Sequence, residues 1–172
     1  MGGKVLVAYG TKHGATGELA ERIGAALREA GLEADVIPAG EVEDISGYGA
    51  VVLGSGVYYG RWLKSAVKFL KRWREELAKV PLWVFSSGPT GEGEPEELTS
   101  GWRSPKPLRS LLESLQPLDI ALFKGKIEPG ELGSLERKVI DKVKAPVGDF
   151  REWGEVEAWA SSIAEHVKEA MP

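Results

Sequence analysis

The stretch VLVAYGTKHGATGELAERI, residues 5–23, constrains the fold more than any other part of the sequence. It runs from a continuous apolar segment through a loop of small and hydroxyl-bearing residues into a pattern with helical spacing. A continuous apolar run with β-branched residues is typical of a strand that is buried on both faces. Such strands belong to parallel sheets covered by helices on both sides, so this segment indicates an α/β fold.

The rest of the chain repeats this alternation of strands and helices. Strands are predicted at residues 4–9, 33–38, 50–55, 81–87 and 117–124, and helices at 15–30, 61–79, 108–115, 134–144 and 152–169. Because neighbouring parallel strands need crossover helices, the order predicts a doubly wound parallel sheet with helices on both faces. The glycine- and proline-rich segment 88–107 is interpreted as a long functional or mobile loop. With 172 residues and no internal repeat or linker, residues 1–172 are expected to form a single domain.

Composition excludes several classes of site and partner. The chain has no cysteine and only two histidines, His13 and His166, so no metal site is expected and redox chemistry needs a bound cofactor. The net charge of -4 argues against a nucleic-acid binder. Residues 1–4 do not resemble a secretory signal, and no apolar stretch approaches the ~20 residues of a transmembrane helix. We therefore expect a cytoplasmic protein.

The loop after the first strand is predicted to hold a phosphate group. Small residues let an anion approach the backbone, and the start of the next helix offers unpaired N–H groups. Glycine spacing argues against the P-loop pattern G-x-x-x-x-G-K-S/T and the dinucleotide pattern G-x-G-x-x-G. The loop instead resembles S/T-x-S/T-G-x-S/T, the phosphate loop of flavodoxins, with His13 at the position where a hydroxyl residue is commonest. Its residues are Thr11, Lys12, His13, Gly14, Ala15 and Thr16.

Two further loops at predicted strand ends carry suitable chemistry for a flavin ring. The stretch GSGVYYGRW, residues 54–62, offers the flat side chains of Tyr58, Tyr59 and Trp62 for stacking. The stretch SSGPTGEG, residues 86–93, offers backbone groups for the polar edge of the ring. The candidate ring-binding residues are Ser55, Gly56, Val57, Tyr58, Tyr59, Gly60, Ser86, Ser87, Gly88, Pro89 and Thr90.

These loops, together with VGDFREWGEVEAWASSIAE at residues 147–165, resemble the flavodoxin-domain family, in particular its quinone-dependent protoporphyrinogen dehydrogenases. The resemblance implies a five-stranded parallel sheet of order 2-1-3-4-5 and a non-covalently bound FMN. It implies that residues 11–16 hold the phosphate and that residues 55–60 and 86–90 flank the flavin. It also implies an oxidoreductase whose redox partner is a quinone, a porphyrinogen or an electron-transfer protein. The alternatives are an electron carrier without its own small-molecule substrate and a flavin-free binding module.

Other features have a structural and a functional interpretation. Trp153 and Trp159 lie at helical spacing and are expected to pack in the core, and Asp149 is interpreted as the cap of the last helix. The cationic helix predicted at 61–79 is either a solvated face or a docking surface for an acidic redox partner or an anionic membrane surface. No side chain is assigned a catalytic proton transfer.

Overall fold

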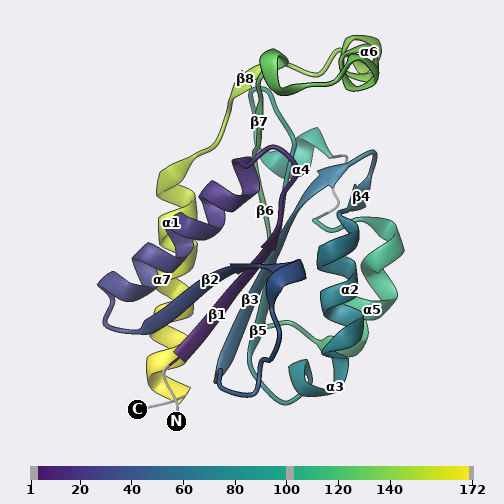
Figure 1. Ribbon diagram of the computed structural model, residues 1–172. Coiled ribbons are helices and arrows are strands. Elements are labelled where there is room, and N and C mark those ends of the chain that lie inside the picture. Colours follow the sequence, from purple (N-terminus) through teal and green to yellow (C-terminus); the bar gives the residue numbers. More distant parts are fainter. Residues whose placement is uncertain (1–3, 100–102, 171–172) are drawn as a thin grey trace.

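A parallel sheet forms the centre of the molecule in the computed structural model, which describes residues 4–99 and 103–170 (Figure 1). Its main strands, in spatial order, are β2 (Glu33–Pro38), β1 (Lys4–Gly10), β3 (Ala50–Tyr58), β5 (Leu82–Ser87) and β6 (Asp119–Phe123). A short antiparallel strand, β4 (Arg61–Trp62), pairs with the end of β3 and lies off this path. Counted along the chain, the five parallel strands have the order 2-1-3-4-5, which confirms the predicted fold class.

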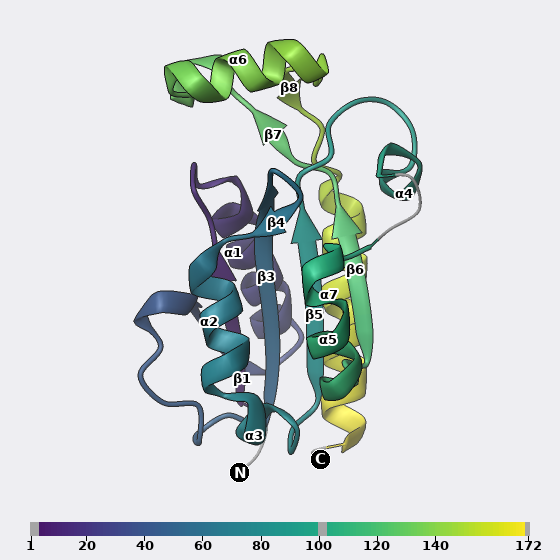
Figure 2. The same ribbon diagram turned by 90° about the vertical axis from the view of Figure 1, so that its right-hand side faces the viewer.

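Helices cover both faces of the sheet (Figures 1 and 2). α1 (Ala15–Glu29) and α7 (Trp153–Ala170) lie on one face, and α2 (Lys64–Arg72), α3 (Arg74–Leu77) and α5 (Arg109–Leu115) on the other. Val5 and Val7 of β1 pack with the first group of helices, whereas Leu6 and Ala8 pack with the second. Successive side chains of a strand point to opposite faces, which explains why this strand is apolar throughout.

The strand register brings the predicted loops to one edge of the sheet. Gly10 at the end of β1 lies beside Ser55 of β3, and Gly56 of β3 lies beside Ser87 at the end of β5. Parallel strands all end at the same edge, so the segments that follow β1, β3 and β5 emerge together.

An aromatic cluster fixes the centre of the core. Phe85 is fully buried, and its ring lies 5.8 Å from that of Phe123 and 5.9 Å from that of Trp159. A Cβ atom on Gly54 would lie 2.0 Å from the Phe85 ring, so β3 needs a glycine there. Trp153 and Trp159 are partly buried and both pack against the apolar core on this face of the sheet, which confirms their predicted packing role.

The helix predicted at 61–79 is divided in the structure. β3 continues to Tyr58, and Tyr59 and Gly60 then reverse the chain with φ angles of 53° and 72°. This two-residue turn pairs Arg61 and Trp62 with the end of β3. α2 therefore starts only at Lys64, and the helix is interrupted again at Trp73 before α3. The prediction was wrong here because helical spacing in the sequence gives no sign of a turn with positive φ angles.

The segment predicted as one loop at 88–107 is partly helical. It contains α4 (Pro95–Leu98) and the 3-10 turn η2 (Lys106–Leu108), while residues 100–102 lie outside the described part of the chain. Another 3-10 turn, η1 (Ala39–Glu41), follows β2. The expectation that the start of the sequence does not resemble a secretory signal was made on residues 1–4, of which residues 1–3 also lie outside the described part.

An arm extends beyond the carboxyl edge of the sheet (Figure 2). Its base is the antiparallel pair of β7 (Lys126–Ile127) and β8 (Gly148–Asp149), and its end carries η3 (Pro129–Glu131) and α6 (Ser134–Val143). We call residues 126–149 the α6 arm. None of the helices within residues 4–99 and 103–170 has the length and apolar character needed to cross a bilayer.

Candidate functional site

A cleft of about 770 Å³ lies between the carboxyl edge of the sheet and the α6 arm. His13 from the first predicted loop, Val57, Tyr58 and Tyr59 from the second, and Gly88, Pro89 and Thr90 from the third line this cleft together. The opposite wall comes from the arm, through Leu132, Val139, Ile140 and Val143. The structure thus brings the three loops together and adds an apolar wall that the sequence analysis did not place.

The first loop is shaped to receive an anion. Gly14 precedes α1 with a φ of 89°, and its N–H group donates to the Thr11 hydroxyl at 3.0 Å. A Cβ atom on Gly14 would have no neighbour within 4 Å, so the approach to the backbone is open. The first N–H groups of α1 follow immediately and lack partners within the helix. This geometry suits a phosphate group.

Tyr58 of the second loop lies against the first loop and Gly56. Burial raises the pKa of Tyr58 above 10.0, its ordinary value, and the backbone of Lys12 and His13 acts in the opposite direction. The ring lies over Gly56, where a Cβ atom would come within 2.7 Å of it. Tyr58 thus packs against Gly56, where a side chain would displace its ring.

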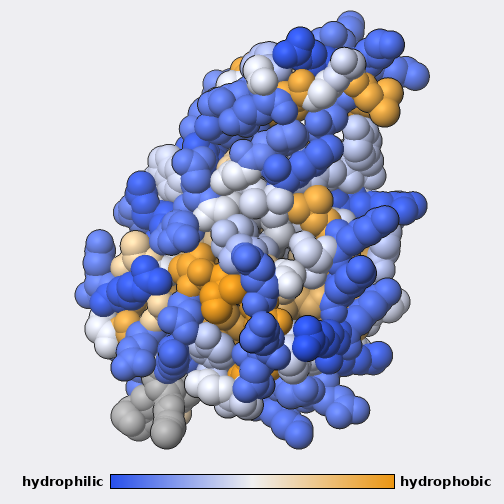
Figure 3. All heavy atoms as spheres, viewed as in Figure 1, coloured by the Kyte–Doolittle hydropathy of each residue, from blue (hydrophilic) through white to orange (hydrophobic). Residues whose placement is uncertain are grey.

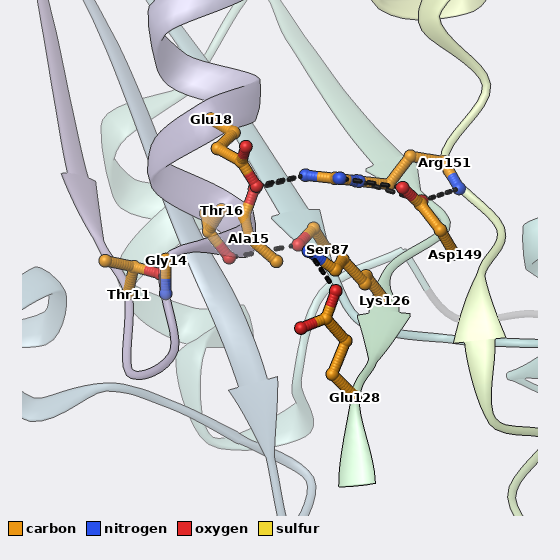
Figure 4. A network of polar contacts seen from close by, with 10 residues as sticks. All are labelled: Thr11, Gly14, Ala15, Thr16, Glu18, Ser87, Lys126, Glu128, Asp149 and Arg151. Carbon is orange, nitrogen blue, oxygen red and sulfur yellow. Dashed lines mark hydrogen bonds and ion pairs between the residues drawn. The ribbon is translucent and has the colours of Figure 1, made fainter. Parts of the chain in front are cut away.

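A buried hydroxyl pair joins the first and third loops beneath the cleft. Thr16 Oγ1 lies 3.1 Å from Ser87 Oγ, and both residues are buried (Figure 4). The Thr16 hydroxyl therefore connects the start of α1 to the end of β5, and the Thr11 hydroxyl is used by Gly14.

The hydroxyls of Ser55 and Ser86 hold the segment that follows the tyrosines. Both residues are fully buried. Ser55 Oγ donates to the carbonyl of Gly56 and accepts the N–H of Leu63, while Ser86 Oγ accepts the indole N–H of Trp62 at 2.8 Å. Trp62 is itself only 5% exposed, so its predicted stacking on a flavin gives way to a packing role.

Tyr59 differs from its neighbour in exposure. Its side chain is 63% exposed at the rim of the cleft, and its backbone is in the left-handed region. Gly60 follows it and lines a smaller adjoining cavity of about 470 Å³ together with Val57, Gly88 and Val143. Tyr59 therefore offers a solvent-facing ring beside the cleft, whereas Tyr58 offers a half-buried one.

The third loop packs on the base of the arm. Gly88 donates its N–H to the carbonyl of Phe123 at 3.2 Å, and Gly125 donates to the carbonyl of Pro89 at 2.9 Å. A Cβ atom on Gly125 would lie 2.9 Å from the Cα of Gly88, so only glycine permits this approach. Residues 88–90 are thereby fixed against the strand that leads into the α6 arm.

Glu136 of the α6 arm contacts two side chains of the first loop. Its Oε2 lies 3.0 Å from His13 Nε2 and 3.1 Å from Lys12 Nζ. The hydrogen bond with His13 is the main reason why the pKa of Glu136 falls to about 2. Its other oxygen accepts the N–H of Gly133 at the start of α6. A glutamate three residues after a helix start indicates such a cap in the sequence, but not the contact with His13.

Arg151 clamps the base of the arm to the start of α1 (Figure 4). Its guanidinium binds Asp149 at 2.8 Å and Glu18 at 2.9 Å, and it also lies over the Trp153 ring. The hydrogen bonds from Arg151 are the main reason why the pKa of the Asp149 carboxyl is lowered. The predicted role of Asp149 as a helix cap is wrong, because α7 starts at Trp153 and the Asp149 carboxylate is taken up by Arg151.

A comparison with known protein families identifies the family of this chain. The Flavodoxin domain family matches residues 6–152, which is most of the chain. The chain belongs to this family. FMN is accordingly its cofactor, and the open backbone at Gly14 fits the phosphate of that group.

Relatives of known activity match part of the chain. Protoporphyrinogen IX dehydrogenase [quinone] of Escherichia coli strain K12 is 29% identical over 85 residues, which are 48% of this chain and 47% of that protein. The matched stretch thus spans about half the length of the curated relative.

Solved structures share the fold. A flavodoxin from the domain Archaea superposes with a TM-score of 0.59 at 20% identity, covering 96% of this chain and 99% of that one. The rubredoxin oxygen:oxidoreductase of Desulfovibrio gigas gives a TM-score of 0.64 at 18% identity, covering 97% of this chain but 36% of that one.

Proposed function

We propose that this protein is an FMN-dependent oxidoreductase that exchanges electrons with a flat, apolar small molecule of the quinone or porphyrinogen class. The observation that carries the proposal is the apolar wall that the α6 arm sets opposite the flavin loops. A cleft of about 770 Å³ has room for a drug-sized molecule beside a ring. The name of the Escherichia coli relative points to the same substrate classes.

The residues of the chain bind and orient the cofactor in this proposal. Bound FMN supplies the electron or hydride transfer. The backbone of residues 11–16 holds its phosphate, Tyr58 and Tyr59 flank its ring, and the backbone of residues 88–90 meets its polar edge. Ser55, Ser86 and Trp62 keep the tyrosine turn in place from below. No side chain is assigned a proton transfer.

The arm provides the substrate contact. α6 has no fully buried residue, so its apolar side chains are not committed to the protein core. Val143 is 63% exposed and lines the cleft, while Leu135 is 72% exposed and lies outside the set of lining residues. Figure 3 shows apolar atoms exposed at this end of the molecule. An apolar molecule in the cleft covers Val143 and leaves Leu135 in water.

Two matched substitutions test this function. The FMN-loaded protein is assayed for electron transfer with a soluble quinone and with protoporphyrinogen. We expect Val143→Asp to raise KM by about tenfold, because a charge would replace the apolar side chain that bound substrate covers, and Leu135→Asp to leave KM unchanged. Equal effects of the two variants, or no turnover of either substrate by the wild type, would contradict the proposal.

An electron carrier is the second candidate, and the exposure of Tyr59 favours it. An exposed ring at the cofactor rim allows transfer to a protein partner without a bound substrate. Reduction of a partner protein with no turnover of small molecules would favour this candidate. A protein that stays colourless after incubation with FMN would instead indicate a flavin-free module.

We also propose that residues 1–172 form a single domain, that the protein is cytoplasmic and that its membrane contact is peripheral.

A further inference from the structure

A second groove lies away from the cofactor cleft, between α2 and the segment formed by η2 and α5. Its volume is about 610 Å³. Its apolar lining comes from both sides: Trp62, Val67, Pro105, Pro107, Leu108 and Leu111. Trp62 and Leu108 are buried and form the floor, whereas Val67 and Leu111 are half-buried at the sides. We call this feature the basic groove because of the charges on its rim.

Four cations line the basic groove: Arg61, Lys64, Lys68 and Lys71. All four are exposed. The three lysines recur at intervals of four and three residues and so form one row along α2, about 10 Å long at 1.5 Å per residue. Within residues 4–99 and 103–170, no ion pair joins any of the four to a carboxylate.

Further cations surround the groove. Arg72 and Arg74 line neighbouring hollows, and Lys106 of η2 and Arg109 of α5 belong to the elements that form the opposite wall, although they do not line the groove themselves. The nearest acidic residues along these elements are Glu75 and Glu76 of α3 and Glu113 of α5. The whole chain has a net charge of -4, so this concentration of positive charge is a local property of one face.

We propose that the basic groove binds an acidic amphipathic segment of a protein partner. Carboxylates three and four residues apart on a helix form a row that matches the lysines of α2. The apolar side of such a helix then fills the space between α2 and α5. A row of cations beside a concave apolar floor favours this occupant over a bilayer, since a flat anionic surface meets the lysines without reaching the floor.

The groove also adjoins the cofactor site. Arg61 and Trp62 form β4, which pairs with Val57 and Tyr58 of β3, and Val57 and Tyr58 line the cofactor cleft. A partner seated in the groove is therefore held next to the cofactor rim. This link to electron transfer rests on the proposed function, whereas the binding itself does not.

Binding of a designed peptide tests the proposal directly. The probe is a fluorescein-labelled helical peptide with glutamates on one side and leucines on the other, and its control has glutamine in place of every glutamate. We expect the acidic peptide to bind the full-length FMN-loaded chain at about 20 mM salt and to lose most of its affinity at about 300 mM. The glutamine peptide should bind at least tenfold more weakly.

Matched charge removal locates the site. The variant K64Q/K68Q/K71Q should bind the acidic peptide about tenfold more weakly, the sum of three partly exposed ion pairs. The control K138Q/K142Q/K168Q removes the same number of lysines from α6 and α7 and should bind like the wild type. Circular dichroism checks folding, and an FMN titration of both variants shows whether the cofactor site is intact.

Three outcomes would overturn the inference. Equal losses in the two triple variants would mean that only net charge matters. Absence of binding to the wild type, with FMN affinity intact, would remove the docking site and leave the proposed function standing. Tighter binding to phosphatidylglycerol vesicles than to the peptide, lost in K64Q/K68Q/K71Q and absent with phosphatidylcholine, would assign the groove to a membrane surface instead.

Discussion

The imidazole Nε2 of His13 lies 3.0 Å from a carboxylate oxygen of Glu136, although 123 positions separate the two residues. This contact joins the predicted phosphate loop to the α6 arm, and the Lys12 ammonium lies 3.1 Å from the same oxygen. The start of α6 therefore makes a polar contact at the cofactor cleft. The apolar residues of the arm line the same cleft.

Acid should release the arm from the first loop. The pKa of Glu136 is lowered from 4.5 to about 2, so its ionised form contributes stability above pH 4.5 that is lost as the pH falls toward 2. NMR shifts of residues 12, 13 and 133–136, followed from pH 7 to pH 2, measure this change. Glu136→Gln should abolish the transition and, at pH 7, speed local opening of the arm about fivefold, for a loss of about 1 kcal/mol. The exposed Glu113→Gln is the control, and a transition that persists in Glu136→Gln would exclude this carboxylate as its cause.

Substitutions at two glycines distinguish the effect of backbone strain from an effect on phosphate binding. Gly14 and Gly31 flank α1 with φ angles of 89° and 95°, and a Cβ atom on either would have nothing within 4 Å. Gly14→Val and Gly31→Val should each destabilise the fold by about 2 kcal/mol because both are left-handed. Only Gly14→Val should weaken FMN, by at least tenfold, since its side chain blocks the approach to the loop. Urea unfolding and fluorescence titration with FMN measure the two effects, and equal FMN affinity in both variants would place the phosphate elsewhere.

In the two-residue turn at Tyr59 and Gly60, the side chain of Tyr59 lowers backbone stability and provides an aromatic surface. Tyr59 has a φ of 53° and precedes Gly60 in a two-residue hairpin turn, where asparagine is favoured. Tyr59→Asn should therefore raise stability by about 1 kcal/mol and weaken FMN several-fold through the loss of an aromatic contact. Gln116→Asn, at a φ of 49° after α5, is the matched control and should change stability alone. Undiminished FMN affinity in Tyr59→Asn would show that this ring does not touch the flavin.

The contact of Gly54 with Phe85 should limit what β3 tolerates. A Cβ atom at Gly54 would lie 2.0 Å from the Phe85 ring, so Gly54→Ala should destabilise the fold by about 3 kcal/mol. Replacing Phe85 by leucine in the same chain should recover part of this loss, so that the double variant costs less than the sum of its parts. Gly47→Ala, at an open exposed position, is the control. Additive losses in chemical denaturation would argue against a direct clash.

The patterns in the sequence alone determined the class of fold and the edge at which the loops lie, whereas the strand order came from the family resemblance. Apolar runs such as residues 4–9 and helical spacing such as that of residues 15–30 are local patterns, and each reports the burial of one element. Once the strands are parallel, their carboxyl ends must share an edge. The neighbourhood of His13, Tyr58 and Gly88 was therefore predictable from the order of the elements.

Only the tertiary structure decided which side chains in these loops face the cleft and what closes it. Ser55 and Ser86 turn inward to Leu63 and Trp62, and the predicted helix at 61–79 is broken by a turn that depends on pairing with β3. The helix of residues 134–143 was predictable, but its position over His13 was not. Periodicity describes a helix and its apolar side, whereas its partner is set by where the chain returns in space, here through the β7–β8 pair and the Arg151 clamp.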